Sequence, residues 1–300
     1  MFLKVKTLEF SARFQTDLDC KKYLSEIKWK DGFKCVQSGH KACRVRKDFS
    51  RTCNICSHTE SSTANTLFHK VKFGVHKAFF ICFEMSTTTM RLSARYTTAA
   101  FEVTEKTGSL FMHKVREAME SSVKYPMDGI VHVDEFVLGG VEQGKIGRRY
   151  HAKKKKAVTA VQLTKEGRRT YAMGIEDFSA RSLEFIFTNH ISKFAQLTTD
   201  KLLFPFTGWK GCRPIARAYN ITQMESNNGL NFVSLYTMIH QIKSCIRTPY
   251  SLVSDFNLKR YFNEFWLRIN RSQSKETIFN NLITRMVNKE KVNQKYLICS

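Results

Sequence analysis

The stretch from Ile130 to Gly140, IVHVDEFVLGG, places two adjacent carboxylates within an apolar run that favours a buried strand. A buried carboxylate is costly unless it is paired, hydrogen-bonded or bound to a metal ion. A second short apolar stretch, AQLTTD, also closes on an acid, Asp200. A single strand-end aspartate is more simply interpreted as a turn cap. Two of them can share Mg²⁺, a hard cation that prefers oxygen ligands, so Asp134 and Asp200 are candidate metal ligands.

The segments around these acids alternate between strand and helix patterns. We predict strands at GIVHVDEFV and in a hairpin formed by KKKKAVTAVQLT, the turn KEG and RRTYAMGI. A helix is predicted after the N-cap Ser179, and two more are predicted over residues 231–247 and 258–271. The order strand-Asp, hairpin, helix, strand-Asp, helix indicates an α/β fold of the RNase H-like type, with a mixed sheet and helices, over residues 123–300.

Two smaller modules are predicted ahead of this domain. Residues 1–70 begin with a helix around TDLDCKKYLSEIKW and continue with Cys, His and turn residues. Residues 71–122 are helical in pattern, with a break at FEVT and a second helix capped by Thr104, which suits a helix-turn-helix. Amphipathic helix pairs also occur in many folds without binding DNA. The positions of the second helix expected to be exposed are Lys106, His113, Lys114 and Arg116, and Lys106, Lys114 and Arg116 are the expected DNA contacts.

The cysteines of the first module have the spacing of a zinc ribbon with one departure. Cys53 and Cys56 are separated by two residues in CNIC, a spacing that can place both thiolates on one tetrahedral zinc ion. Cys35 begins a partner pair, but Ser38 stands where the second Cys is expected, and a hydroxyl is a poor zinc ligand. Cys43 or His40 could supply the fourth ligand instead. The alternative is that these are ordinary buried thiols.

The charge of the chain points to a polyanionic partner. Lys and Arg number 49 against 26 acidic residues, a net charge of +23. A merely soluble basic surface is the simpler explanation, but an excess this large favours nucleic acid, because each neutralised phosphate releases counterions. No apolar run is long enough for a membrane span, and the N-terminal MFLKVKTLEF lacks a signal-peptide pattern, so we expect a chain that stays inside the cell and does not bind membranes.

Five stretches carry a family resemblance: VDEFVLGG, GRRYHAKKKK, TTDK, GWKG and YFNEFWLRINR. Together they resemble insertion-sequence transposases of the DDE class, most closely the prokaryotic group related to Merlin elements, over about residues 10 to 290. Members carry a zinc ribbon, a helix-turn-helix and an RNase H-like DDE domain. The resemblance implies Mg²⁺ or Mn²⁺ in catalysis, a structural Zn²⁺, and double-stranded DNA as terminal inverted repeats and target. It also implies a homo-oligomer at the nucleoid of a bacterial cytoplasm.

The resemblance assigns the first two catalytic acids to Asp134 and Asp200. The third catalytic residue of the family is Glu, Asn or His, seven positions before a Lys on one helix, so that both share a face. Here the Lys is Lys243, expected to contact DNA phosphate, and the third position is Tyr236, a poor Mg²⁺ ligand; His240 lies one turn further along. An apparent insertion, KLLFPFTG at 201–208, and Cys212 in place of an aromatic residue also depart from the family.

These departures define two main hypotheses. The first is a DNA transposase, which in this copy is impaired. The second is a transposase remnant without catalysis that still binds inverted repeats. A resolvase or other nuclease of the same fold would fit the two acids but not the N-terminal modules.

Overall fold

The computed structural model describes the chain in ten segments: residues 6–88, 92–120, 125–139, 154–164, 167–200, 220–224, 227, 230–247, 255–293 and 296–297. Within them, eight side chains are not described: those of residues 180, 200, 220, 223, 247, 255, 256 and 273. The chain divides into two compact units, Met1–Glu120 with Ser274–Ser300, and Ser121–Gln273. None of the described helices is both long enough and apolar enough to cross a membrane.

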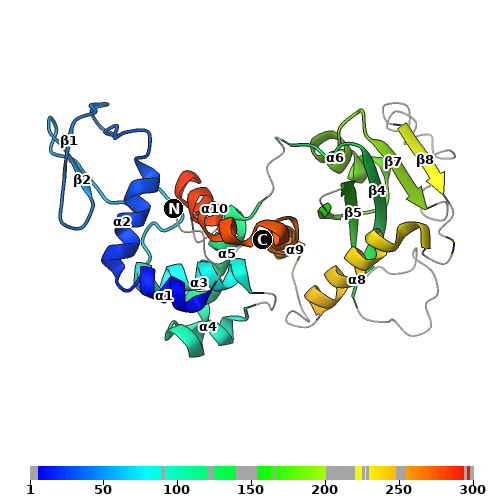
Figure 1. Ribbon diagram of the computed structural model, residues 1–300, viewed down its shortest axis with the longest axis horizontal. Coiled ribbons are helices and arrows are strands. Elements are labelled where there is room, and N and C mark those ends of the chain that lie inside the picture. Colours follow the sequence, from blue (N-terminus) through cyan, green and yellow to red (C-terminus); the bar gives the residue numbers. More distant parts are fainter. Residues whose placement is uncertain are drawn as a thin grey trace. The chain divides into compact units, whose positions relative to one another are not determined.

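The first unit combines helices with a small three-stranded sheet (Figure 1). Its sheet has the order β1-β2-β3, with antiparallel neighbours. The predicted N-terminal helix is α2, which begins with a capping box at Thr16. The elements are α1 (Thr7–Arg13), α2 (Asp17–Lys28), β1 (Cys43–Val45), β2 (Arg51–Cys53), β3 (Thr59–Glu60), α3 (Val75–Thr87), α4 (Ala94–Phe101), α5 (Glu105–Ala118) and α10 (Lys275–Asn288).

The C-terminal helix α10 belongs to the core of this first unit. Its Phe279 ring lies 5.1 Å from Phe10 and 5.9 Å from Phe83, within a group of aromatic rings from α1 and α3. At its end, the Lys289 ammonium donates to the Glu117 carbonyl of α5 at 2.7 Å. The sequence groups residues 274–300 with the α/β domain, whereas the apolar face of α10 packs on residues far earlier in the chain.

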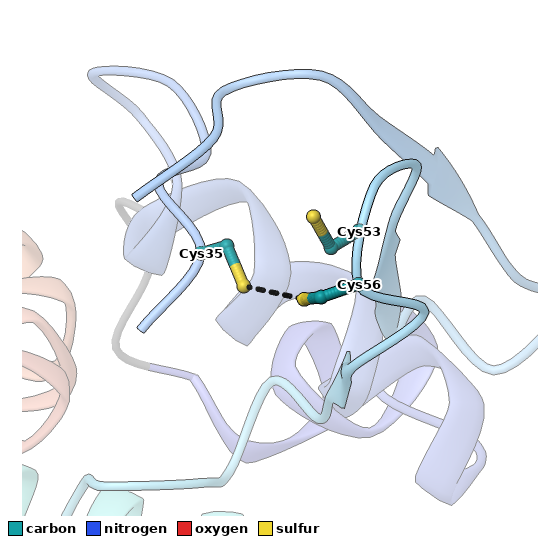
Figure 2. Close-up of side chains that lie close together, drawn as sticks. All are labelled: Cys35, Cys53 and Cys56. Carbon is teal, nitrogen blue, oxygen red and sulfur yellow. Dashed lines mark hydrogen bonds between the residues drawn. The ribbon is translucent and has the colours of Figure 1, made fainter. Parts of the chain in front are cut away.

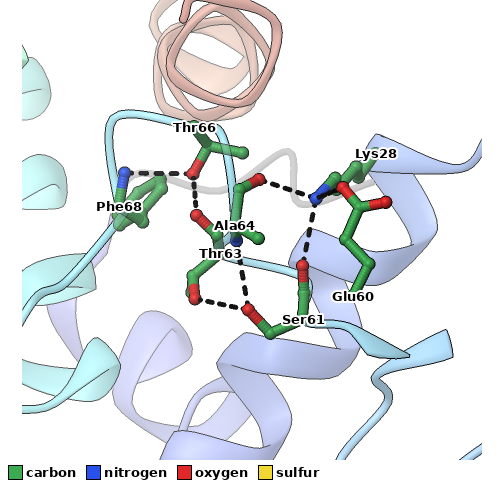
Figure 3. Close-up of polar contacts among 7 residues, drawn as sticks. All are labelled: Lys28, Glu60, Ser61, Thr63, Ala64, Thr66 and Phe68. Carbon is green, nitrogen blue, oxygen red and sulfur yellow. Dashed lines mark hydrogen bonds and ion pairs between the residues drawn. The ribbon is translucent and has the colours of Figure 1, made fainter. Parts of the chain in front are cut away.

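A buried ion pair fastens the loop after β3 to the end of α2 (Figure 3). The Lys28 ammonium lies 2.6 Å from a carboxylate oxygen of Glu60 and donates to the carbonyls of Ser61 at 3.0 Å and Ala64 at 2.7 Å. Burial lowers the pKa of Lys28, and the Glu60 carboxylate opposes this shift. The loop that leads out of the cysteine module is therefore held to α2 by charge-assisted hydrogen bonds.

The second unit is a mixed α/β domain built on a five-stranded sheet of order β6-β5-β4-β7-β8. β4, β5 and β6 are antiparallel neighbours, while β4 pairs with β7, and β7 with β8, in parallel. The predicted strands, hairpin and helices are confirmed, including the N-cap Ser179, whereas β8 is an addition. The prediction that Asp134 ends its strand is wrong, because β4 stays paired with β5 as far as Leu138. The elements are β4 (Ile130–Leu138), β5 (Lys155–Thr164), β6 (Gly167–Ile175), α6 (Ala180–His190), β7 (Gln196–Asp200), β8 (Asn220–Met224), η2 (Leu230–Phe232), α8 (Val233–Arg247), α9 (Asp255–Asn270) and η3 (Ser272–Ser274).

Helices cover both faces of this sheet, as Figure 1 shows for α6 and α8. Val131 and Val133 of β4 pack with α6 residues such as Ile186. Phe136 and Leu138 pack with α8 and α9 instead. Side chains of a strand alternate between its two faces. The odd-numbered residues of β4 therefore face α6, and the even-numbered ones face α8 and α9.

The helix α9 also closes the free edge of the sheet at β6. The side-chain amide of Asn270 accepts from the Thr170 N–H at 2.7 Å and donates to the Thr170 carbonyl at 2.8 Å. The Trp266 indole N–H donates to the Ala172 carbonyl at 3.2 Å. These bonds satisfy backbone groups that an exposed edge would offer to another strand.

Candidate functional site

The carboxylate of Asp134 lies inside the protein, on the face of the sheet covered by α8. Asp134 is 2% exposed, and one of its oxygens accepts the N–H of Glu135 at 2.7 Å. By alternation it shares its face with Phe136, whose ring packs against α8. Glu135 is 6% exposed and by alternation shares the α6 face with Val133. It is therefore buried and points away from Asp134.

The parallel register brings the positions of the two acids together. Val133 of β4 is paired with Thr199 of β7, so the next residues along the two strands are Asp134 and Asp200. Neighbouring strands lie about 4.8 Å apart. The backbone of Asp200 thus lies beside that of Asp134 at the same level of the sheet, while the side chain of Asp200 lies outside the described atoms.

Two contacts fix how α8 crosses this face. The His132 ring lies 5.1 Å from Phe232, just before α8, and the Lys243 ammonium lies 5.9 Å from the Phe136 ring centroid. Asp134 stands between His132 and Phe136 on the strand, and Tyr236 stands between Phe232 and Lys243 on the helix. The helix segment that holds Tyr236 therefore runs over the strand segment that holds Asp134.

The three α8 residues considered for this site differ in their surroundings. Tyr236 is half-buried, with its ring 6.0 Å from Phe232, and packs against the apolar layer under α8. Lys243 and His240 are exposed. Oxygen donors of Asp134 suit a hard cation, but a neutral phenol at Tyr236 is a poor third ligand. The predicted insertion 201–208 and Cys212 lie outside the described residues.

The helix pair predicted in residues 90–119 is present as α4 and α5. Glu102 ends α4 in the left-handed conformation with φ of 52°, and α5 begins after Thr104, the predicted cap position. The two helices approach closely at Gly108, where an added Cβ would lie 2.5 Å from the Thr97 hydroxyl. Residues 94–118 thus form two helices joined by a short turn.

The exposure predicted along α5 is only partly correct. Lys106 is exposed, but Arg116 is 1% exposed and His113 is buried, so the prediction is wrong for these two. Lys114 is half-buried, its ammonium lies 3.4 Å from the His69 carbonyl, and burial lowers its pKa. The reason is that α3 and α10 both pack on α5, and α10 lies far away in the sequence.

A basic hairpin is an exposed feature that the sequence patterns did not single out. The antiparallel strands β1 and β2 are joined by a turn in which the Arg46 N–H donates to the Ser50 carbonyl at 2.9 Å. Asp48 in this turn accepts from the Ser50 hydroxyl at 2.6 Å, which lowers the pKa of Asp48. Four cationic side chains on and before the hairpin are exposed: Lys41, Arg44, Arg46 and Lys47.

Three cysteines gather at the base of this hairpin (Figure 2). The sulfur atoms of Cys35, Cys53 and Cys56 all lie within 4.8 Å of one another, and those of Cys35 and Cys56 are 3.5 Å apart. In a tetrahedral zinc site with Zn–S bonds near 2.3 Å, sulfur atoms are about 3.8 Å apart. The three thiols thus fit three corners of such a site. Among the described residues, neither Cys43 nor His40 belongs to this group.

Ser38 lies against the same cluster. Its hydroxyl is 3.4 Å from the Cys53 sulfur. Hydrogen bonding to Ser38 lowers the pKa of the Cys53 thiol to about 6 and also lowers the pKa of Cys35. The hydroxyl therefore favours the thiolate form of the ligands that zinc requires.

Together, these features define an α/β domain in which Asp134, in the middle of β4, and Asp200, the last residue of β7, hold neighbouring positions on two parallel strands. The other unit carries the cysteine cluster. Residues 126–270, which include both acids, match the family described as the ISXO2-like transposase domain. This match assigns residues 126–270 to the insertion-sequence transposases of the DDE class. No curated protein matches the chain.

Proposed function

We propose that the chain is a DNA transposase that binds terminal inverted repeats and cuts and joins DNA strands by metal-dependent phosphoryl transfer. The observation that carries this proposal is the register of β4 and β7, which aligns the positions of Asp134 and Asp200. The transposase family match over residues 126–270 supports the same chemistry.

The sheet supports an RNase H-like assignment of the second unit. If the five strands are numbered along the chain, they lie across the sheet in the order 3-2-1-4-5. Strands 1, 2 and 3 are antiparallel neighbours, and the pairs 1–4 and 4–5 are parallel. This arrangement places the first strand in the centre beside the fourth. Asp134 in the middle of β4 and Asp200 at the end of β7 then hold neighbouring positions in the sheet.

The chemistry proposed at this pair of acids is an in-line displacement at phosphorus. Water would be the nucleophile for cleavage and a 3′-hydroxyl for strand transfer, so no covalent enzyme intermediate is needed. A bound Mg²⁺ or Mn²⁺ would supply charge neutralisation for the attacking and leaving oxygens. Asp134 and Asp200 would hold the cation, and Lys243, exposed near Phe136, would contact a DNA phosphate.

The DNA-binding surface is proposed to lie in the first unit. Arg44, Arg46 and Lys47 of the basic hairpin are exposed, as is Lys106 near the start of α5. In helix-turn-helix proteins the N-terminal residues of the second helix contact base edges. Lys106 therefore remains a candidate contact, whereas the burial of Arg116 and the packing of Lys114 argue against these two. Two paired DNA ends would require at least a dimer.

A second candidate function is a DNA-binding remnant without catalysis. It is favoured by Tyr236, which lies on the helix segment over Asp134 where the family has a carboxylate, amide or imidazole. A phenol packed against apolar side chains offers little to a hard cation. The two candidates share the DNA-binding surface and differ in whether the acid site completes a metal-binding set.

The test is Asp134→Asn in the full-length protein, assayed for Mg²⁺- or Mn²⁺-dependent cleavage of DNA carrying the element's ends. The amide keeps the shape of the side chain and removes its charge, so cleavage should fall to background while DNA affinity stays unchanged. Equal cleavage by both proteins would refute the catalytic assignment. Absence of metal-dependent cleavage in the wild type, with intact binding to the ends, would favour the remnant.

A further inference from the structure

The cysteine cluster sits between two turns that have the same construction. In the first, the Cys35 N–H donates to the His40 carbonyl and the Gly39 N–H donates to the Cys35 carbonyl, both at 2.9 Å. In the second, the Cys53 N–H donates to the His58 carbonyl at 2.9 Å and the Ser57 N–H to the Cys53 carbonyl at 3.1 Å. Each turn therefore wraps its cysteine with the same pair of backbone bonds.

The backbone conformation repeats as well. Gly39 and Ser57, at matching places in the two turns, both have positive φ, 71° and 57°. Ser38 in the first turn corresponds to Cys56 in the second, since each stands three residues after the cysteine that opens its turn. The two turns thus offer four equivalent positions, of which three carry sulfur.

We infer that Ser38 occupies the fourth corner of this cluster, which makes it a three-thiolate zinc site with an exchangeable fourth position. The distances across the two turns support this placement. The Ser38 hydroxyl lies 3.4 Å from the Cys53 sulfur, and the Cys56 sulfur lies 3.5 Å from that of Cys35. Both separations are close to an edge of a tetrahedral thiolate site.

The structure also describes the other two candidates for the fourth ligand. Cys43 is paired with Cys53 across β1 and β2 and packs against the buried group of Trp29, Phe33, Cys35 and Cys53. His40 contributes its backbone to the first turn, and its N–H donates to the Ser38 hydroxyl at 3.4 Å. Neither side chain joins the group of ligand atoms formed by the described residues.

The chemistry of the fourth corner sets the properties of the site. A neutral hydroxyl is a weak zinc ligand, whereas a thiolate is a strong one. Ser38 and Cys56 are both exposed, so this side of the cluster faces solvent. Water or a small external thiol can therefore reach the fourth position, and the bound ion exchanges more readily than it would with four thiolates.

The experiment compares full-length wild type with Ser38→Cys, using zinc affinity by chelator competition and the absorption of the Co²⁺-substituted protein. Ser38→Cys should tighten zinc binding by roughly 10- to 100-fold, the range that changes around a metal site commonly produce. It should also increase the thiolate-to-cobalt charge-transfer intensity. Added 2-mercaptoethanol should change the spectrum of the wild type and leave that of Ser38→Cys unchanged.

Matched variants at the competing positions complete the test. Cys43→Ser and His40→Ala should leave zinc affinity and the cobalt spectrum unchanged, and Cys53→Ser should abolish binding. A loss of affinity in Cys43→Ser or His40→Ala would assign the fourth corner to that residue and overturn the inference. Failure of both wild type and Ser38→Cys to bind one zinc ion would overturn it too. None of these readouts depends on DNA cleavage, so the result is independent of the proposed reaction.

Discussion

At the residue scale, the most informative side chains are those whose surroundings conflict with their usual preference. Asp134 is a carboxylate that is only 2% exposed, within a mostly apolar strand. Such a position is expensive to maintain without a partner or a bound cation. Tyr236 presents the reverse case, because a large aromatic residue on the helix over Asp134 satisfies packing but offers no charge.

The importance of the third position can be tested by Tyr236→His, with Tyr236→Glu as a second variant. Both side chains offer a donor suited to a divalent cation, so metal-dependent cleavage should rise by roughly 10- to 100-fold. Cleavage of DNA ends at fixed Mn²⁺ concentration provides the measurement.

Tyr236→Phe is the matched control, since it keeps the ring and removes only the hydroxyl. It should show no gain. If neither His nor Glu raises cleavage while both variants remain folded, Tyr236 is not the missing part of the site.

At the element scale, α5 shows how a helix can be amphipathic in sequence and yet be covered on more than one side. Its N-terminal turn is exposed, including Lys106, while Phe111, Val115 and Arg116 are buried. A single helical pattern predicts one core-facing stripe, but α3 and α10 both pack on this helix. The exposed residues of α5, Glu105 and Lys106, therefore lie in its first turn.

This difference in exposure predicts different effects for substitutions of exposed and of packed cationic side chains. Arg44→Ala and Lys106→Ala should each weaken DNA binding and reduce the slope of log affinity against log salt by about 1, because each removes one phosphate contact. Lys114→Ala is the matched control on α5; it should lower the melting temperature and leave the salt slope unchanged. Titrations at several salt concentrations and thermal unfolding measure both effects.

An unchanged salt slope for both Arg44→Ala and Lys106→Ala would remove the basic hairpin and the start of α5 from the DNA-binding surface. A reduced slope for Lys114→Ala, with unchanged stability, would contradict the packing role of that residue.

At the scale of the whole molecule, the chain leaves the first unit after Glu120, forms the α/β unit and returns to the first unit at Ser274. The returning helix α10 buries six apolar side chains: Ile278, Phe279, Leu282, Ile283, Met286 and Val287. The first unit is therefore discontinuous in sequence, and its core is complete only when the C-terminal segment is present.

Phe279→Ala should consequently destabilise the first unit by about 3–5 kcal/mol, the usual cost of deleting a fully buried aromatic ring. Phe185→Ala on α6, where the ring is 50% exposed, is the control and should change stability little. Hydrogen exchange resolved by segment provides the measurement, since local stability differs between parts of one protein.

The expected result is faster exchange in residues 6–120 of Phe279→Ala, with the strands of the α/β unit unchanged. Slower or equal exchange in the first unit would show that α10 adds little to its stability.

The sequence by itself determined the elements of the second unit, because strand alternation, the Ser179 cap and helical periodicity are local signals that tertiary contacts here reinforce. It also identified the acids and three cysteines, since these residue types carry their chemistry with them. It did not reveal β8, the burial of Arg116 or the membership of α10. Those depend on packing between residues distant in the chain, as does the alignment of Asp134 with Asp200. The sequence aligned Ser38 with the missing cysteine, but only the tertiary structure showed that its hydroxyl lies 3.4 Å from the Cys53 sulfur, because two turns separated in sequence form the cluster together.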